Sequence, residues 1–190
     1  DTGGDGTPEG PLTDWLGDEF AYLPAGDLIP GSGEGRADET IYAPGIRFPM
    51  ELPRAFANSQ VYMPGGQFGP SGWQCDPVNY QYPWRDNFCE DRRYATPFCP
   101  SGTGHQGQDI RPPTCPPLEP RDARPEYWAV AAADGQITGV TGHIVTLDAD
   151  DGTRFLYMHL DPDSLVVDAE DRVARGDRIG VISNYFGSTP

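Results

Sequence analysis

Residues 143–159 read HIVTLDADDGTRFLYMH and predict a β-hairpin. Two runs rich in apolar, β-branched and aromatic residues, His143–Leu147 and Thr153–His159, flank the segment Asp148–Gly152. Two such runs joined by a short segment of Asp and Gly are typical of paired antiparallel strands. The sequence does not fix the register of this hairpin, so it does not say whether His143 and His159 share a face of the sheet.

Further strands are predicted on both sides of the hairpin. Before it, Val130–Ala133 and Gln136–Val140 flank an Asp-Gly turn; after it, Arg172–Ile182 reads as strand, Gly-Asp turn and strand. Closely spaced short strands favour an antiparallel sheet or a small barrel. We therefore predict a mainly β fold without a convincing helix, and one more strand upstream, Asn58–Met63, that ends in the turn Pro64–Gly66.

A long irregular segment, residues 72–124, contains all four cysteines. An even number of cysteines in loop-rich chain predicts two disulfides and an oxidising compartment. Short local loops favour the pairs Cys75–Cys89 and Cys99–Cys115. The alternative is a metal site of four thiolates, but none of the cysteines shows the close C-x2-4-C spacing of such sites.

Residues 1–45 are dominated by Gly, Pro, Asp and Glu and are expected to form a linker-like, loosely packed or disordered extension. The domain itself is predicted to span residues 46–190. A formal charge of -16 disfavours nucleic acid and anionic membranes as partners. No apolar run has the length of a membrane span.

The segment Gly104–Asp109 carries the strongest signal for chemistry. In an extended strand, the Cα atoms of His105 and Asp109 would lie about 13 Å apart, too far to share one ion. Gly104 and Gly107 allow the chain to curve and bring the two side chains together. His159 could supply a third ligand or act as a base, whereas His143 reads as a half-exposed strand residue.

These segments resemble the LytM/lysostaphin-type zinc endopeptidases, which cut peptide cross-links in bacterial cell walls. The resemblance covers about Ile46 to Pro190. Four motifs agree with the family in order and spacing: the H-x-x-x-D motif at His105 and Asp109, the Gly-x-x-Val strand at Gly142–Val145, the aromatic-x-His-Leu strand end at Tyr157–Leu160, and the V-x-x-G-D-x-I-G hairpin at Val173–Gly180.

The resemblance implies a LytM-type domain that is a secreted, periplasmic or cell-surface zinc metalloendopeptidase acting on peptidoglycan peptides. It implies that His105 and Asp109 bind zinc and that His159 is catalytic. The family's third ligand lies in an H-x-H motif, which the resemblance places beyond Pro190 in a missing C-terminal part. The alternative is an inactive LytM-like domain that binds cell-wall peptides or regulates another hydrolase. The oligomeric state is not predicted.

Overall fold

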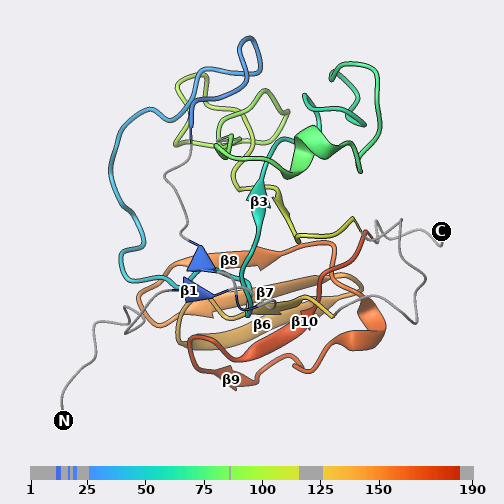
Figure 1. The fold of residues 1–190 in the computed structure, drawn as a ribbon. Helices are drawn as coiled ribbons and strands as arrows, with labels where there is room; N and C mark the ends of the chain where they lie inside the picture. The colour runs from blue at the N-terminus through green and yellow to red at the C-terminus, as the bar shows by residue number, and fades with distance from the viewer. Residues whose placement is uncertain are drawn as a thin grey trace. The chain divides into compact units, whose positions relative to one another are not determined.

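The computed structural model describes residues 26–85, 87–115 and 126–184, together with residues 12–13, 17 and 19–20. The first 25 residues of the predicted extension are otherwise outside the described residues, as are residues 185–190. The fold is mainly β and antiparallel, as predicted, and its only helices among the described residues are two short 3-10 turns (Figure 1).

The chain divides into two compact units, each formed by separate stretches of sequence. Unit 1 consists of Asp1–Phe20, Ile41–Pro53 and Arg121–Pro190, and unit 2 of Ala21–Thr40 and Arg54–Pro120. Within the predicted extension, Gly33 pairs with Glu90 in an isolated bridge, and the backbone amide of Ala37 donates to Phe98 O at 2.9 Å. Residues 26–40 are therefore hydrogen-bonded to the cysteine-bearing loops of unit 2.

Unit 1 contains the hairpin predicted over His143–His159. The hairpin predicted at Val173–Gly180 is wrong, because its two strands do not pair with each other: Arg172–Val173 pairs with Gly135–Gln136, and Arg178–Val181 pairs with Trp128–Val130. The strand predicted over Val130–Ala133 is Trp128–Val130. A four-stranded antiparallel sheet has the order β8-β7-β6-β9, and a separate antiparallel pair is formed by β5 and β10 (Figure 1). A 3-10 turn, η4, precedes the C-terminal strands, and a short pair, β1 and β2, also belongs to this unit. The bounds are β1 Leu12–Thr13, β2 Glu19–Phe20, β5 Trp128–Val130, β6 Gly135–Thr141, β7 Ile144–Ala149, β8 Arg154–Tyr157, η4 Pro162–Ser164, β9 Arg172–Val173 and β10 Arg178–Val181.

The core of unit 1 follows the two-residue period of its strands. In β7, Val145, Leu147 and Ala149 are buried and alternate with half-buried residues. Val145 pairs with Tyr157 of β8 in the register of the predicted hairpin. Burial of a Val or Leu side chain contributes about 1.5–3 kcal/mol, so this alternation fixes which face of the hairpin is inward. The buried cluster comprises Ala129, Ala131, Ile137, Val145, Leu147, Tyr157, Leu160, Val167, Val173 and Ile179.

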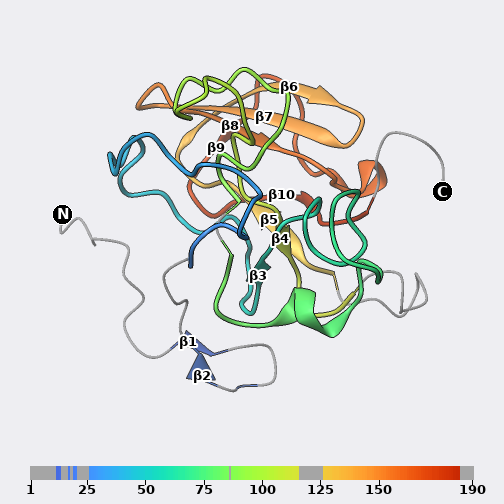
Figure 2. The same ribbon diagram turned by 90° about the horizontal axis from the view of Figure 1, so that it is seen from above.

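Unit 2 has little regular structure. Its described elements are β3 (Phe56–Ala57), the 3-10 turn η1 (Pro77–Tyr80) and β4 (Ile110–Arg111), with β3 and β4 paired antiparallel (Figure 2). Buried side chains form hydrogen bonds to backbone carbonyls that strand pairing does not satisfy here. Asn79 Nδ2 donates to Pro64 O, and Asn58 Nδ2 donates to Asn79 O, both at 2.9 Å. The described part of the loop-rich segment predicted over residues 72–124 thus belongs to a folded unit.

The strand predicted over Asn58–Met63 is wrong, because β3 ends at Ala57 and the chain then bends. Ser59 Oγ accepts hydrogen bonds from the backbone amides of Val61 and Tyr62 at 3.0 and 2.8 Å. Such local bonds from a serine hydroxyl compete with strand pairing. The turn that follows is present, since the Gly66 amide donates to Met63 O at 2.9 Å.

The two predicted disulfides are present, but their predicted pairing is wrong. Cys89 pairs with Cys99 and Cys75 with Cys115, across 10 and 40 residues. The chain after Cys89 folds back on itself, and Ala95 bridges Thr103 across the return. This return brings Cys99 beside Cys89 and leaves Cys75 to pair with Cys115 across 40 residues, which a preference for two short local loops does not foresee. Two disulfides are compatible with an extracellular location. Among the described residues, no helix has the length and apolar character needed to cross a bilayer.

Candidate metal centre

The H-x-x-x-D segment is held against the chain around Cys89. The His105 amide donates to Glu90 O at 2.9 Å, and the Cys89 amide donates to His105 O at 2.8 Å. Gly104 has a φ of +154°, and a Cβ there would lie 3.0 Å from Sγ of Cys99 and 3.1 Å from Cα of Cys89. A side chain here would be strained and would require its neighbours to shift, so the position favours glycine. Gly107, the other glycine expected to let the chain curve, has no positive φ.

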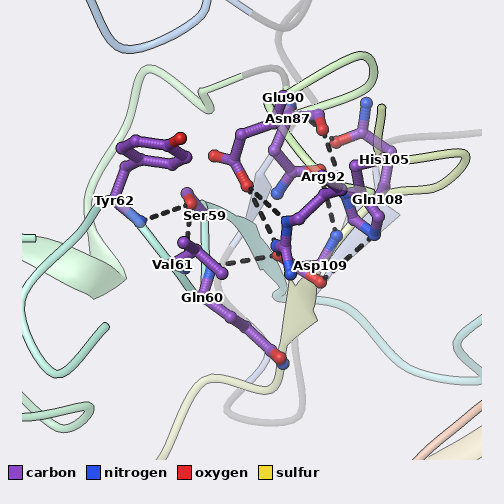
Figure 3. Close-up of polar contacts among 10 residues, drawn as sticks. All are labelled: Ser59, Gln60, Val61, Tyr62, Asn87, Glu90, Arg92, His105, Gln108 and Asp109. Atoms are coloured by element: carbon purple, nitrogen blue, oxygen red, sulfur yellow. Dashed lines mark hydrogen bonds and ion pairs between the residues drawn. The ribbon is translucent and has the colours of Figure 1, made fainter. Parts of the chain in front are cut away.

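The imidazole of His105 is oriented by a backbone carbonyl. Its Nδ1 lies 3.0 Å from Asn87 O, which can only accept, so Nδ1 carries the proton of this bond and the neutral tautomer has its lone pair on Nε2. Nε2 points to Asp109 and lies 3.7 Å from Oδ1 (Figure 3). A histidine that donates its second ring N–H to a carbonyl is the usual arrangement around a bound metal.

The carboxylate of Asp109 is fixed from the opposite side. Oδ2 accepts from the Gln60 amide at 2.9 Å and from Nη2 of Arg92 at 3.3 Å. The Asp109 amide donates to the Asn87 side chain at 3.1 Å. Asn87 therefore positions both the imidazole and the aspartate backbone, and Oδ1 is the oxygen turned toward His105 (Figure 3).

Glu90 completes the group and was missed by the sequence analysis. It is fully buried, and Glu90, His105 and Asp109 can each offer one ligand atom with all three atoms within 4.8 Å of one another. In the sequence, Glu90 belongs to the charged run Glu90–Arg93, which reads as a solvent-exposed turn. Its position next to the half-cystine Cys89 was the one available signal for burial.

Burial has a clear electrostatic effect on Glu90. Loss of water raises the pKa of its carboxyl, and hydrogen bonding to Ser59 and Arg92 opposes the rise without cancelling it. Oε2 accepts from Arg92 at 2.9 Å, whereas Oε1 is buried without a hydrogen bond of normal geometry. The buried carboxyl group of Glu90 therefore has fewer hydrogen bonds than it would have in water.

The arrangement can bind a divalent cation. Ligand atoms at about 2.0–2.1 Å from a tetrahedral zinc ion are roughly 3.3 Å apart, close to the 3.7 Å between Nε2 of His105 and Oδ1 of Asp109. The remaining polar atoms of both side chains already have hydrogen-bond partners. The group of one imidazole and two carboxylates is consistent with several metals, among them zinc.

His159 lies in unit 1, two residues after the end of β8, and has a φ of +63°. Its ring stacks on that of His143, with centroids 5.5 Å apart and an interplanar angle of 18°. Because Val145 pairs with Tyr157, the same register places residue 143 opposite residue 159. The sequence alone does not fix this pairing. The predicted catalytic role of His159 beside His105 and Asp109 stays a prediction.

Comparisons with known proteins give no relative for this chain: no family model, no curated protein and no solved structure matches it.

Proposed function

We propose that this chain is a zinc-dependent endopeptidase domain that cleaves peptide cross-links of bacterial peptidoglycan. The observation that supports the proposal most strongly is the approach of Nε2 of His105 to Oδ1 of Asp109 at 3.7 Å. In the sequence, these residues form the H-x-x-x-D motif that resembles the LytM-type enzymes. Their remaining polar atoms are held by Asn87, Gln60 and Arg92, the kind of outer support that metal ligands require.

His105 and Asp109 would hold the ion, and a third protein ligand would come from an H-x-H motif that the 190 residues do not contain. Bound zinc would polarise the scissile carbonyl and lower the pKa of water toward ~7. Hydrolysis adds the water oxygen to the carbonyl carbon, breaks the C–N bond and leaves a new amine. His159 would take the proton from the attacking water and return it to the leaving nitrogen.

The two disulfides agree with activity outside the cytoplasm, where the substrate lies. The strongly acidic surface, with a formal charge of -16, agrees with a peptide substrate better than with nucleic acid. Peptidoglycan peptides are therefore the proposed partner, and a secreted, periplasmic or cell-surface location is proposed with them.

A second candidate is an inactive LytM-like domain that binds cell-wall peptides or regulates another hydrolase. The contact that favours it is Arg92, whose guanidinium lies 3.3 Å from Asp109 and already gives this carboxylate a cationic partner. In that case the group would be a structural ion network, and the peptides would bind without being cut.

The test is digestion of cross-linked peptidoglycan, with zinc added, by a protein in which these 190 residues are followed by a segment that carries the H-x-H motif, and counting of new amino termini. Cleavage should stop with a chelator and in Asp109→Ala, while Asp27→Ala, which removes an exposed carboxylate of the same unit, should cut normally. Retention on insoluble peptidoglycan without new amino termini would favour the second candidate. No retention and no cleavage would contradict both.

A further inference from the structure

A continuous chain of polar contacts leads from a buried carboxylate to the candidate ligand pair (Figure 3). Arg92 donates to Oε2 of Glu90 through Nη2 at 2.9 Å and through Nε at 3.3 Å. The same Nη2 lies 3.3 Å from Oδ2 of Asp109, whose other oxygen faces His105. Arg92 therefore joins the buried glutamate to the aspartate that we propose as a ligand.

The contacts of Arg92 fix the rotation of the Asp109 carboxylate. An aspartate carboxyl group turns freely over a broad range, because the torsion to its sp2 carbon has no sharp wells. Here Oδ2 receives two donors, Nη2 of Arg92 and the Gln60 amide at 2.9 Å. With Oδ2 held in this way, Oδ1 is the oxygen left to face Nε2 of His105.

The positive charge of Arg92 must be balanced by a nearby acidic group if this site is to bind a cation. An arginine alone beside Asp109 would neutralise the carboxylate and repel a second cation in a poorly solvated site. The side chain of Glu90 is 1% exposed and provides the opposite charge within 2.9 Å. Because Arg92 contacts Glu90 as well as Asp109, the arginine does not face the aspartate alone.

We infer that Arg92 is a positioning residue for the metal ligand Asp109, and that Glu90 acts through Arg92 rather than as a ligand itself. The inference rests on the proposed metal site. It separates two roles for Glu90 that the group of three residues leaves open: a third ligand, or the counter-charge that allows Arg92 to hold Asp109.

A mutant cycle read by zinc affinity tests this inference. Zinc is titrated calorimetrically into the 190-residue chain and into Arg92→Met, Glu90→Gln, the double variant and Arg92→Lys. Arg93→Met is the matched control, because Arg93 is the exposed neighbour of Arg92. Disulfide mapping and circular dichroism confirm that each variant is folded, and the affinities require no catalytic activity.

We expect Arg92→Met and Glu90→Gln each to weaken zinc binding by roughly 10–100-fold, the usual cost of losing an outer-shell partner. The double variant should bind zinc as weakly as Arg92→Met alone, because Glu90 affects the ion only through its contact with Arg92. Arg92→Lys keeps the charge but loses the fork, so its affinity should fall between wild type and Arg92→Met. Arg93→Met should match wild type.

If the loss of zinc affinity in the double variant equals the product of the two single-variant losses, the inference is overturned and Glu90 is a ligand. Unchanged or tighter binding in Arg92→Met would overturn it by making Arg92 a competing cation, and if Arg92→Met does not fold, wild-type or tighter binding by Arg92→Lys would do the same. If the wild-type chain binds no zinc, both the proposed metal site and this inference are overturned. If the wild-type chain binds zinc and Arg92→Met binds it with the same affinity, only the inference is overturned.

Discussion

Nε2 of His105 lies 3.7 Å from Oδ1 of Asp109, although an extended chain would hold their Cα atoms about 13 Å apart. Hydrogen bonds of the backbone of both residues hold the two side chains near each other. The His105 amide and carbonyl are bonded to Glu90 and Cys89, while the Asp109 carbonyl accepts from the Asn58 amide at 3.3 Å. Two separate segments of unit 2 therefore hold the ends of the curve.

The Cys89–Cys99 disulfide should matter more for metal binding than the Cys75–Cys115 disulfide. Removing Cys89–Cys99 by a double Cys→Ala change should cost about 3 kcal/mol of unfolding free energy, and removing Cys75–Cys115 about 4 kcal/mol, on loop entropy. Zinc affinity should fall mainly in the variant without Cys89–Cys99, because the backbone amide of Cys89 donates a hydrogen bond to the carbonyl of His105. Denaturant titration and calorimetry measure both effects. Equal losses of affinity would contradict the link between Cys89 and the site.

Gly104→Ala should destabilise unit 2 by more than conformational strain alone. Its new Cβ would meet Sγ of Cys99 and Cα of Cys89 at 3.0–3.1 Å, at a φ of +154°. Gly102→Ala is the control, because Gly102 also has a positive φ of +73° but nothing lies within 4 Å of its Cβ position. We expect a loss of about 1–2 kcal/mol in the control and a larger loss, with weaker zinc binding, in Gly104→Ala. Equal unfolding free energies would show that the close approach is unimportant.

The stability of unit 1 should fall at high pH because of Tyr157. Burial raises the pKa of its phenol to about 12, and its hydroxyl accepts from the Ala132 amide at 2.7 Å. In the unfolded chain the phenol ionises near 10, so the unfolded state loses its proton first. The contribution of Tyr157 is complete below pH 10 and is lost as the pH rises toward 12, by about 3 kcal/mol in total.

The control for this pH dependence is Tyr157→Phe. It loses the hydrogen bond to Ala132 and should be less stable than wild type at neutral pH by about 1–3 kcal/mol. The difference between the two proteins should shrink between pH 10 and pH 12, as followed by chemical denaturation at each pH. A difference that stays constant over this range would contradict a pKa of Tyr157 that is raised by folding.

His159→Ala should separate catalysis from metal binding. If His159 acts on the attacking water, its loss should leave zinc content unchanged and lower turnover by roughly 10²–10⁴-fold. His143→Ala removes only the ring stacked 5.5 Å away, so its loss of turnover should be smaller. Zinc analysis and peptide cleavage on both variants give the answer. Loss of zinc in His159→Ala would make His159 a ligand instead of a base.

The hairpin of β7 and β8 could be predicted because its information is local. Apolar alternation and the Asp-Gly segment mark both strands in the sequence, and burial of Val145 and Leu147 then fixes the register. That register also determines the pairing of His143 with His159, which the sequence could not give, because a shift by one residue would reverse the faces. The strands β9 and β10 are also marked by the sequence, but their pairing with β6 and β5 joins distant segments and was not predicted.

Unit 2 was less predictable because its contacts join distant segments. The H-x-x-x-D motif identified His105 and Asp109, and the glycine before it explained their approach. Glu90 was hidden in a charged run that reads as exposed, and the disulfide pairing depends on how the chain returns between Cys89 and Cys99. Burial of Glu90 arises from tertiary structure alone, so no periodicity in the sequence could reveal it.

Zinc titration of the 190-residue chain and of its His105→Ala and Asp109→Ala variants tests the central claim most directly, with His143→Ala as a matched histidine control. We expect the wild-type chain and His143→Ala to bind one ion with the same affinity. The two ligand variants should bind far more weakly, since each loses a direct contact with the ion. No binding by the wild-type chain, or binding that neither His105→Ala nor Asp109→Ala reduces, would contradict the metal site at His105 and Asp109.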